Sequence, residues 1–347
     1  MDSGPRPTPP QTFLDLVDAC DNYTVPKYAD EFKDEVLAPW HLAPVASSPV
    51  VGLIRPCVVA QLKLETTGLW TFFSLGGRER VSFSAVLDTP AKRTQAMKEL
   101  CERWRDQGLW PAQIGPKKWR AEMYPIYRNP FGKHDAPVAE KGEEETGDDS
   151  TNYAFMMERS AAALFGVVTY GVHMTVYHGS IEEQNCKIWV PTRARTKQTW
   201  PGYLDNSVAG GIPSGYGIFE SLVKESMEEA SIPEDIVRNY AKSVGVISYF
   251  YRTKAGWLQP EVEYAYHICI PDGFEFQPKP LDGEVEAFEL LELSEVISKL
   301  RAGLFKANCA LVLIDFLINQ GYITPDNEPD YLEIVTRMHG RFDYEHW

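Results

Sequence analysis

The stretch at residues 210–232, GGIPSGYGIFESLVKESMEEASI, decides what kind of domain this chain forms. A glycine-rich turn runs directly into a segment that carries Glu225, Glu228 and Glu229, and the spacing predicts a helix over about 218–230. Residues three and four apart share one face of a helix, so the three carboxylates converge there. Like charges this close repel one another, and Mg²⁺ or Mn²⁺ would neutralise them. The pattern predicts a divalent-metal site; a solvated acidic helix face is the alternative interpretation.

Composition limits the classes of function. The chain has 347 residues and 44% hydrophobic composition, enough for a sizeable core and about two domains. Its net charge of −15 argues against a nucleic-acid partner but not against a small anionic ligand. The longest apolar run, 309–318, is interrupted by Asp315, so we expect no membrane span. The start of the chain lacks signal and transit patterns, which predicts a soluble, cytoplasmic protein.

A shift in composition suggests a domain boundary. Residues 136–152, APVAEKGEEETGDDSTN, are rich in acidic residues and hold almost no large apolar ones. The predicted organisation is a disordered N-terminus at 1–12, an N-terminal α/β domain at 13–135, an acidic linker or loop at 136–155 and a second domain at 156–347.

Hydrophobic periodicity predicts a mixed α/β chain. Helices are expected over 13–35 and 89–108, the second with Thr89 as cap. Residues 51–63 are strand-like with a break at Pro56. A hairpin is expected from 165–179 and 186–195, and further strands and two helices follow the acidic helix. Strands on both sides of a central helix indicate an α/β domain with a mixed sheet.

The acidic segment resembles the signature of the Nudix hydrolases, G-x5-E-x7-R-E-U-x-E-E-x-G-U, where U is aliphatic. Gly210, Glu225, Glu228, Glu229 and Ile232 occupy matching positions. The departures are Tyr216 for the first Glu, Lys224 for Arg, Ser226 for an aliphatic residue and Ser231 for the last Gly. The E-x-x-E-E run that holds metal in the family is complete.

The flanking segments resemble one eukaryotic Nudix branch, often labelled thiamine pyrophosphokinase-related. They are TWPGYLDNSVAGGIPSG, DGEVEAFELLEL and FKANCALVLIDFLINQGYITPDNEPDY, and the resemblance extends from about Phe13 to Tyr331. It implies a Nudix α/β/α sandwich with a mixed sheet, preceded by a smaller N-terminal α/β domain. It also implies hydrolysis of thiamine diphosphate-like compounds, notably oxidised or damaged forms such as oxythiamine diphosphate, to the monophosphate and phosphate.

The resemblance assigns roles to the acidic residues. Glu225, Glu228 and Glu229 would hold Mg²⁺ or Mn²⁺, with the Gly210 carbonyl as a further ligand, and Glu225 could instead orient water. The general base would come from another loop. Glu284, or Glu286 in the same DGEVEAF segment, lies where the superfamily often supplies such a carboxylate; an ordinary acidic loop is the alternative.

Basic and aromatic residues before the turn predict a substrate site. Arg193, Arg195 and Lys197 alternate on or after a strand, so they would point the same way and clamp a diphosphate. A solvated basic edge is the alternative. Trp200 and Tyr216 could stack on the cationic ring of a thiamine-like ligand, or they could simply pack.

Two other functions stay open at this point. An isomerase of isopentenyl-type diphosphates would need a cysteine acid, and Cys186 is the nearest candidate. A non-catalytic binding module would explain the missing glutamate at Tyr216. A true thiamine kinase is disfavoured because no GxxxxGK[ST] loop is present. The expected partner is a small-molecule diphosphate, and a homodimer is left open.

Overall fold

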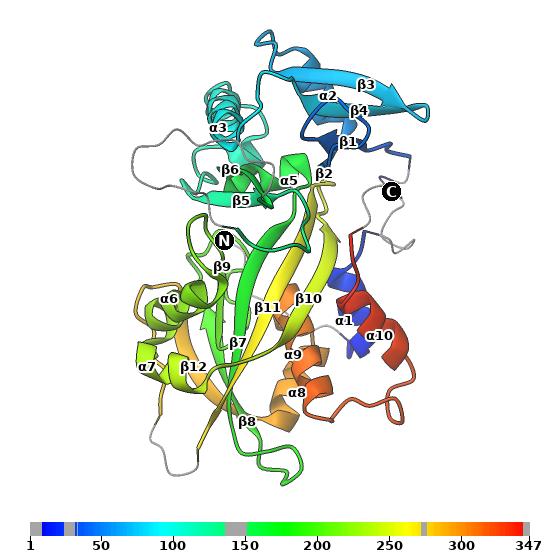
Figure 1. Cartoon of the computed structure of the whole chain (residues 1–347). Coiled ribbons are helices and arrows are strands. Elements are labelled where there is room, and N and C mark those ends of the chain that lie inside the picture. The colour runs from blue at the N-terminus through cyan, green and yellow to red at the C-terminus, as the bar shows by residue number, and fades with distance from the viewer. Residues whose placement is uncertain (1–8, 24–31, 33, 136–150, 272–275, 343–347) are drawn as a thin grey trace.

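The computed structural model describes residues 9–23, 32, 34–135, 151–271 and 276–342 (Figure 1). Most of the predicted tail at 1–12 and of the acidic linker at 136–155 lies outside the described residues. No helix among the described residues is long and apolar enough to cross a bilayer.

The first part of the chain forms an N-terminal lobe, from β1 to α5. Its elements are β1 (Ala38–His41), β2 (Val50–Ile54), α2 (Pro56–Lys63), β3 (Trp70–Leu75), β4 (Arg78–Phe83), α3 (Pro90–Asp106), α4 (Pro111–Ile114), β5 (Met123–Tyr127), β6 (Tyr153–Glu158), a 3₁₀ turn (Arg159–Ala161) and α5 (Ala162–Phe165). The first four strands make a sheet in the order β2-β1-β4-β3, and β5 pairs with β6 alone. Aromatic rings of Trp40, Phe83, Trp104, Phe155 and Phe165 fill the core between them.

The second part is a sandwich around a mixed sheet. Its strands are β7 (Thr169–His178), β8 (Lys187–Arg193), β9 (Val208–Gly211), β10 (Lys242–Arg252), β11 (Leu258–Ile270) and β12 (Val285–Glu292). They run in the order β10-β11-β7-β8-β12, with β9 also paired to β7. The pair β11–β7 is parallel, whereas the other pairs are antiparallel.

Helices cover both faces of this sheet. They are α1 (Phe13–Cys20), α6 (Ile218–Ala230), α7 (Glu234–Tyr240), α8 (Leu293–Arg301), α9 (Ala307–Asn319) and α10 (Tyr331–Met338). One apolar core joins α6 and α7 to the sheet, and a second core joins α1, α8, α9 and α10 to it (Figure 1). The predicted α/β/α sandwich with a mixed sheet is therefore confirmed, and so is a separate α/β lobe in the N-terminal part of the chain.

Local signals explain which elements were predictable. Helix α6 has the predicted bounds, and α3 begins after Thr89, whose side chain accepts the Lys92 N–H. The predicted hairpin is present as β7 and β8. Residues 51–63 are a strand followed by a helix, because Pro56 suits the first turn of a helix and starts α2.

The first helix does not pack in the N-terminal lobe. Phe13, Leu16, Val17 and Cys20 of α1 are buried against α9 and α10 of the sandwich. The predicted helix over 13–35 ends at Cys20. The assignment of residues 13–20 to an N-terminal domain is wrong for this helix, because its apolar face completes the core of the second domain.

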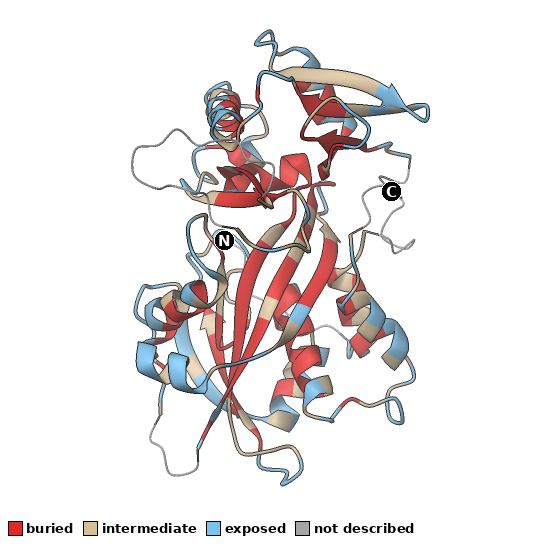
Figure 2. Cartoon of the chain, in the orientation of Figure 1, coloured by how far each residue is buried: buried red, intermediate tan, exposed pale blue. Residues whose placement is uncertain are grey.

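The lobe is fastened to one end of the sheet. Arg55 of the lobe forms an ion pair with Glu35 at 2.7 Å, and its guanidinium donates to the Ala255 carbonyl in the β10–β11 turn at 2.8 Å. Arg252 of β10 also pairs with Glu35. Buried residues extend from the central strands into the lobe (Figure 2). The junction is thus a packed interface.

Candidate active site

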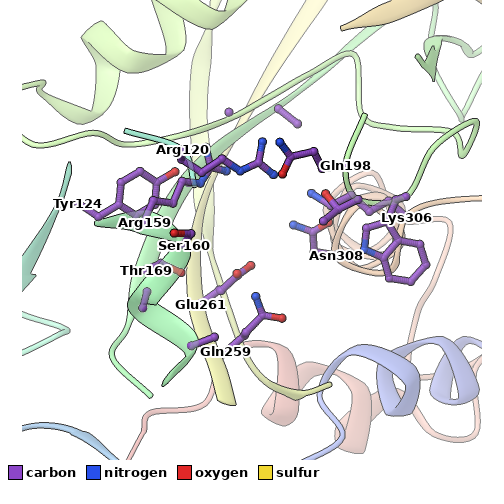
Figure 3. Close-up of a pocket in the computed structure, with 18 of the residues that line it drawn as sticks. Arg120, Tyr124, Arg159, Ser160, Thr169, Gln198, Gln259, Glu261, Lys306 and Asn308 are labelled. Atoms are coloured by element: carbon purple, nitrogen blue, oxygen red, sulfur yellow. The ribbon is translucent and has the colours of Figure 1, made fainter. Parts of the chain in front are cut away.

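A cavity of about 550 Å³ lies where the lobe meets the sandwich. Residues of the lobe, the glycine turn, α6, strand β11 and the start of α9 line it, and ten of them are labelled in Figure 3. The lining is rich in charged residues of both signs. This volume suits a ligand the size of a drug or coenzyme.

Glycine at position 210 lets the acidic helix approach the sheet. Gly210 lies on β9, and a Cβ atom there would be 2.2 Å from Cγ of Glu225. Leu222 and Val223 bury the other side of α6 against the sheet. Glu225, Glu228 and Glu229 all line the cavity beside Gly210, and their joint role as metal ligands stays a prediction.

The three glutamates differ in environment. Glu229 is buried and accepts the Ala209 N–H at 3.2 Å. Burial raises the pKa of Glu229 to about 8, and the negative charges of Asp205 and Glu225 contribute to the rise. Burial likewise raises the pKa of Glu225. Glu228 is half exposed and lies 2.8 Å from the Lys224 ammonium.

This donor set fits a hard divalent cation. In the part of the chain that the structure describes, no three acidic, histidine or cysteine side chains converge as a preformed metal site. Instead, the Lys224 ammonium donates hydrogen bonds to two of these carboxylates, that of Glu225 at 3.3 Å and that of Glu228 at 2.8 Å. Carboxylate oxygens are the ligands that Mg²⁺ and Mn²⁺ prefer. A cation would replace the Lys224 ammonium and relieve the repulsion between Glu225 and Glu229.

The three residues of the predicted basic clamp lie in different environments, and two of them, Arg193 and Lys197, line the cavity. The guanidinium of Arg193 is buried, pairs with Asp205 and donates to the carbonyls of Thr199 and Trp200, both at 3.2 Å. Arg195 is exposed and does not line the cavity. Strand β8 ends at Arg193, so the alternation that aligned these residues does not continue.

Lys197 and Glu284 lie together at the cavity rim. Lys197 lines the cavity and forms an ion pair with Glu284, which lines it as well. Burial lowers the pKa of Lys197 below its ordinary value. Glu286 does not line the cavity, and its carboxylate accepts the main-chain N–H of Arg195 at 3.0 Å. Of the two candidate bases, only Glu284 therefore lines the cavity.

Of the two aromatic residues that were predicted to contact the ligand, one lines the cavity and the other does not. Trp200 lines the cavity, and its ring packs edge-on against Tyr203 with the centroids 4.9 Å apart. Tyr216 is 51% exposed in the turn before α6 and is absent from the described lining. Arg193 holds the backbone of Trp200 in place, so the turn and the strand end form one unit.

A second polar cluster lies deeper in the cavity and was missed by sequence reasoning. Glu263 of β11 is 3.5 Å from Nε2 of His173 and 3.1 Å from the Asn308 amide. Burial alone would raise the pKa of Glu263, but the facing His173 charge lowers it to about 2. Glu261 lies two residues before it on the same face of the strand. The sequence signal that could have revealed this cluster is the placing of the charged Glu261 and Glu263 at alternate positions of an otherwise apolar strand.

Further missed residues come from both parts of the chain. Lys306, just before α9, lines the cavity, as do Arg120, Tyr124, Arg159 and Ser160 of the lobe (Figure 3). No sequence signal connects the residues of the lobe to α6, because they reach the cavity only through the docking of the lobe on the sheet.

Comparison with known proteins matches both parts of the chain. A NUDIX domain model matches residues 173–310, and a model described as a domain of unknown function, DUF4743, matches residues 31–138. The uncharacterized protein YJR142W of Saccharomyces cerevisiae is 40% identical over 242 residues, which are 66% of this chain and 64% of that protein. This chain thus spans slightly less than two thirds of the yeast relative's length.

Two plant proteins match over a larger share. Nudix hydrolase 20, chloroplastic, of Arabidopsis thaliana is 35% identical over 304 residues, covering 86% of this chain and 72% of its own length. Nudix hydrolase 24, chloroplastic, of the same plant is 32% identical over 296 residues, covering 85% and 71%. These matches run through both the lobe and the sandwich.

Proposed function

Because this chain belongs to the Nudix hydrolases, we propose that it uses a divalent metal ion, Mg²⁺ or Mn²⁺, to hydrolyse diphosphates of the thiamine diphosphate type. Oxidised or damaged forms such as oxythiamine diphosphate are included, and the products are the monophosphate and phosphate. The observation that carries the proposal is the acidic face of α6, whose Glu225, Glu228 and Glu229 open onto a cavity of about 550 Å³. The thiamine-related resemblance of the flanking segments supports the substrate class.

Each residue of the site has a separate role in the proposed hydrolysis. When bound, the cation neutralises the diphosphate and makes water more acidic. Glu225, Glu228 and Glu229 would hold it, beside the Gly210 carbonyl. Glu284 would accept the proton of the attacking water, and Lys197 would keep Glu284 oriented and ionised until then. Trp200 would lie against the organic ring, and Glu261 would face its positive charge.

The test is product release from a panel of diphosphates with Mg²⁺ or Mn²⁺, followed by chromatography. The panel holds thiamine diphosphate, its oxidised analogues, ADP-ribose, a dinucleotide and isopentenyl diphosphate. We expect thiamine-type diphosphates to react fastest and Glu228→Gln to lose at least about 10²-fold in kcat. Glu220→Gln is the matched control, because Glu220 is exposed on the same helix and pairs with Arg238. If another diphosphate reacts fastest, the proposed substrate class is wrong, but the proposed diphosphate hydrolase activity stands.

The alternatives receive less support. Cys186, the acid that an isomerase would need, is buried and does not line the cavity. A binding module is the result if a ligand binds and no diphosphate is cleaved. A cytoplasmic location remains a proposal, since both plant relatives are named as chloroplastic. A homodimer also remains a prediction.

A further inference from the structure

The pairing of β5 and β6 brings one end of both strands to the cavity. Met123 of β5 lies opposite Glu158 of β6 in an antiparallel register. The residues just before β5 and just after β6 therefore lie at the same end of the pair. The Arg120 N–H donates to the Glu158 carboxylate at 2.9 Å, and the Arg159 N–H donates to the Glu122 carbonyl at 2.8 Å. These bonds fix both arginines on the side of the lobe that faces α6.

Two hydroxyl groups on this wall have no partner. The Tyr124 and Ser160 hydroxyls are buried and make no hydrogen bond within the described residues, although both residues line the cavity. Buried polar groups are nearly always bonded, so an orphan hydroxyl beside a cavity points to a ligand. Tyr124 lies over Gly211, where a Cβ atom would be 1.6 Å from its hydroxyl oxygen. It therefore adjoins the turn that carries Gly210.

The wall also has an excess of positive charge. Arg159 pairs with Glu122 at 2.8 Å and lies over the Tyr124 ring, 5.0 Å from its centroid. The Arg120 side chain makes no ion pair or hydrogen bond with the described residues, and the two guanidinium groups are close enough to repel each other. The carboxylates beside these two cations are Glu122 and Glu158, and Glu158 does not line the cavity.

This wall and the acidic helix α6 line the same cavity. Figure 3 shows Arg120, Arg159 and Tyr124 gathered on one side, with Glu261 below them. A ligand that reaches from α6 to this wall would meet the two guanidinium groups and the two hydroxyls, with the carboxylates of Glu122 and Glu261 beside them.

We propose that Arg120, Tyr124, Arg159 and Ser160 of the N-terminal lobe bind phosphoryl oxygens of the substrate, so that the diphosphate bridges the lobe and α6. Guanidinium and hydroxyl groups suit phosphate oxygens because each donates to an anion. The proposal rests on the proposed function, in which the ligand is a diphosphate ester. The lobe is then part of the binding site, together with Arg193 and Lys197, which line the same cavity.

The test compares Arg120→Gln and Tyr124→Phe in the full-length chain. Lys117→Gln is the control for charge, because Lys117 is exposed near Arg120 and does not line the cavity. Tyr127→Phe is the control for a hydroxyl, since Tyr127 lies on the same strand away from the cavity. Steady-state kinetics are combined with calorimetric binding of methylenediphosphonate, a diphosphate that cannot be hydrolysed. Thermal unfolding midpoints show that the variants fold.

We expect KM to rise about tenfold or more in each variant while kcat changes by less than about threefold, because a hydrogen bond to a charged group is lost. Methylenediphosphonate should bind more weakly by a similar factor, and the controls should match the wild type. Unchanged KM and unchanged analogue binding would overturn the proposal and leave the hydrolase intact. If the wild type cleaves no diphosphate but binds the analogue through Arg120 and Tyr124, the function is wrong and the binding wall stands.

Discussion

Gly210 and Glu225 show how a single missing side chain shapes the site. The backbone of β9 leaves room for the Glu225 carboxylate only because residue 210 has no Cβ atom. Glu225 is held between this backbone and Lys224, 3.3 Å away. The position of one carboxylate therefore depends on a residue that makes no polar side-chain contact.

Replacing Gly210 with alanine should reduce activity far more than stability. The new Cβ atom would lie within 2.6 Å of three Glu225 atoms, so the flexible carboxylate would be displaced. A misplacement of about 1 Å in a catalytic group costs about 10²-fold in rate. Gly217→Ala is the control, because its nearest neighbour would be 3.9 Å away. Equal kcat in Gly210→Ala and wild type would show that Glu225 has no fixed role.

His267 links stability to acid pH. It is buried edge-on against Phe316, with Asp315 as the nearby charge. Burial lowers the pKa of His267 to about 4, although Asp315 opposes the shift. The folded state then binds fewer protons than the unfolded chain, whose histidine pKa is about 6.5. The contribution to stability is complete above pH 6.5 and is lost as the pH falls through 4.

We expect His267→Phe to lose less stability than the wild type between pH 6.5 and 4. The difference should approach about 3 kcal/mol, the free energy that corresponds to about 2.5 pKa units. Urea denaturation across this pH range measures it. Parallel stability curves for the two proteins would contradict the assignment.

At the scale of elements, α6 and the strand β8 were predictable, whereas the end of β8 was not. The glycines before α6 and the 3.6-residue period of its apolar positions set its bounds, and these depend only on local sequence. Strand β8 ends at Arg193, whose guanidinium pairs with the buried Asp205 twelve residues later. Alternation could not place Arg195 and Lys197, because strand periodicity holds only while the strand lasts.

Helix α6 also carries two serines whose replacement by alanine should change the free energy of unfolding in opposite directions. Ser226 is buried with an unpaired hydroxyl, whereas the Ser221 hydroxyl donates to the Gly217 carbonyl at 3.0 Å. Ser226→Ala should raise the free energy of unfolding by about 1 kcal/mol, and Ser221→Ala should lower it by about 1 kcal/mol. Urea denaturation of both variants is the measurement. A loss of stability in Ser226→Ala would show that its hydroxyl is bonded in solution.

At the scale of the whole molecule, the cavity depends on the docking of the lobe. The acidic helix could be predicted because its residues are neighbours in sequence. The wall formed by Arg120 and Tyr124 could not, because about 100 residues separate it from α6 and a long-range interface brings the two together. The residues of α6 could therefore be predicted from local sequence patterns, whereas the residues of the lobe could be found only from the three-dimensional fold.

The junction should weaken when its central carboxylate is neutralised. Glu35 pairs with Arg55 and Arg252, and Glu35→Gln would leave two guanidinium groups facing each other. We expect a loss of about 2 kcal/mol, measured by urea denaturation, and faster hydrogen exchange in the β10–β11 turn. Glu295→Gln should change stability by less than about 0.5 kcal/mol, because its pair with Lys299 is exposed. Unaltered exchange in the turn would show that apolar packing alone holds the junction.

The packing of α1 against α9 and α10 has a topological consequence. The chain begins in the sandwich, passes through the lobe and returns to the sandwich at β7, so the lobe is an insertion and not a domain in front of it. A truncated protein that starts at residue 156 would lack both the lobe and a helix of the sandwich core. Such a fragment would expose the apolar surface that Phe13, Leu16 and Val17 normally cover.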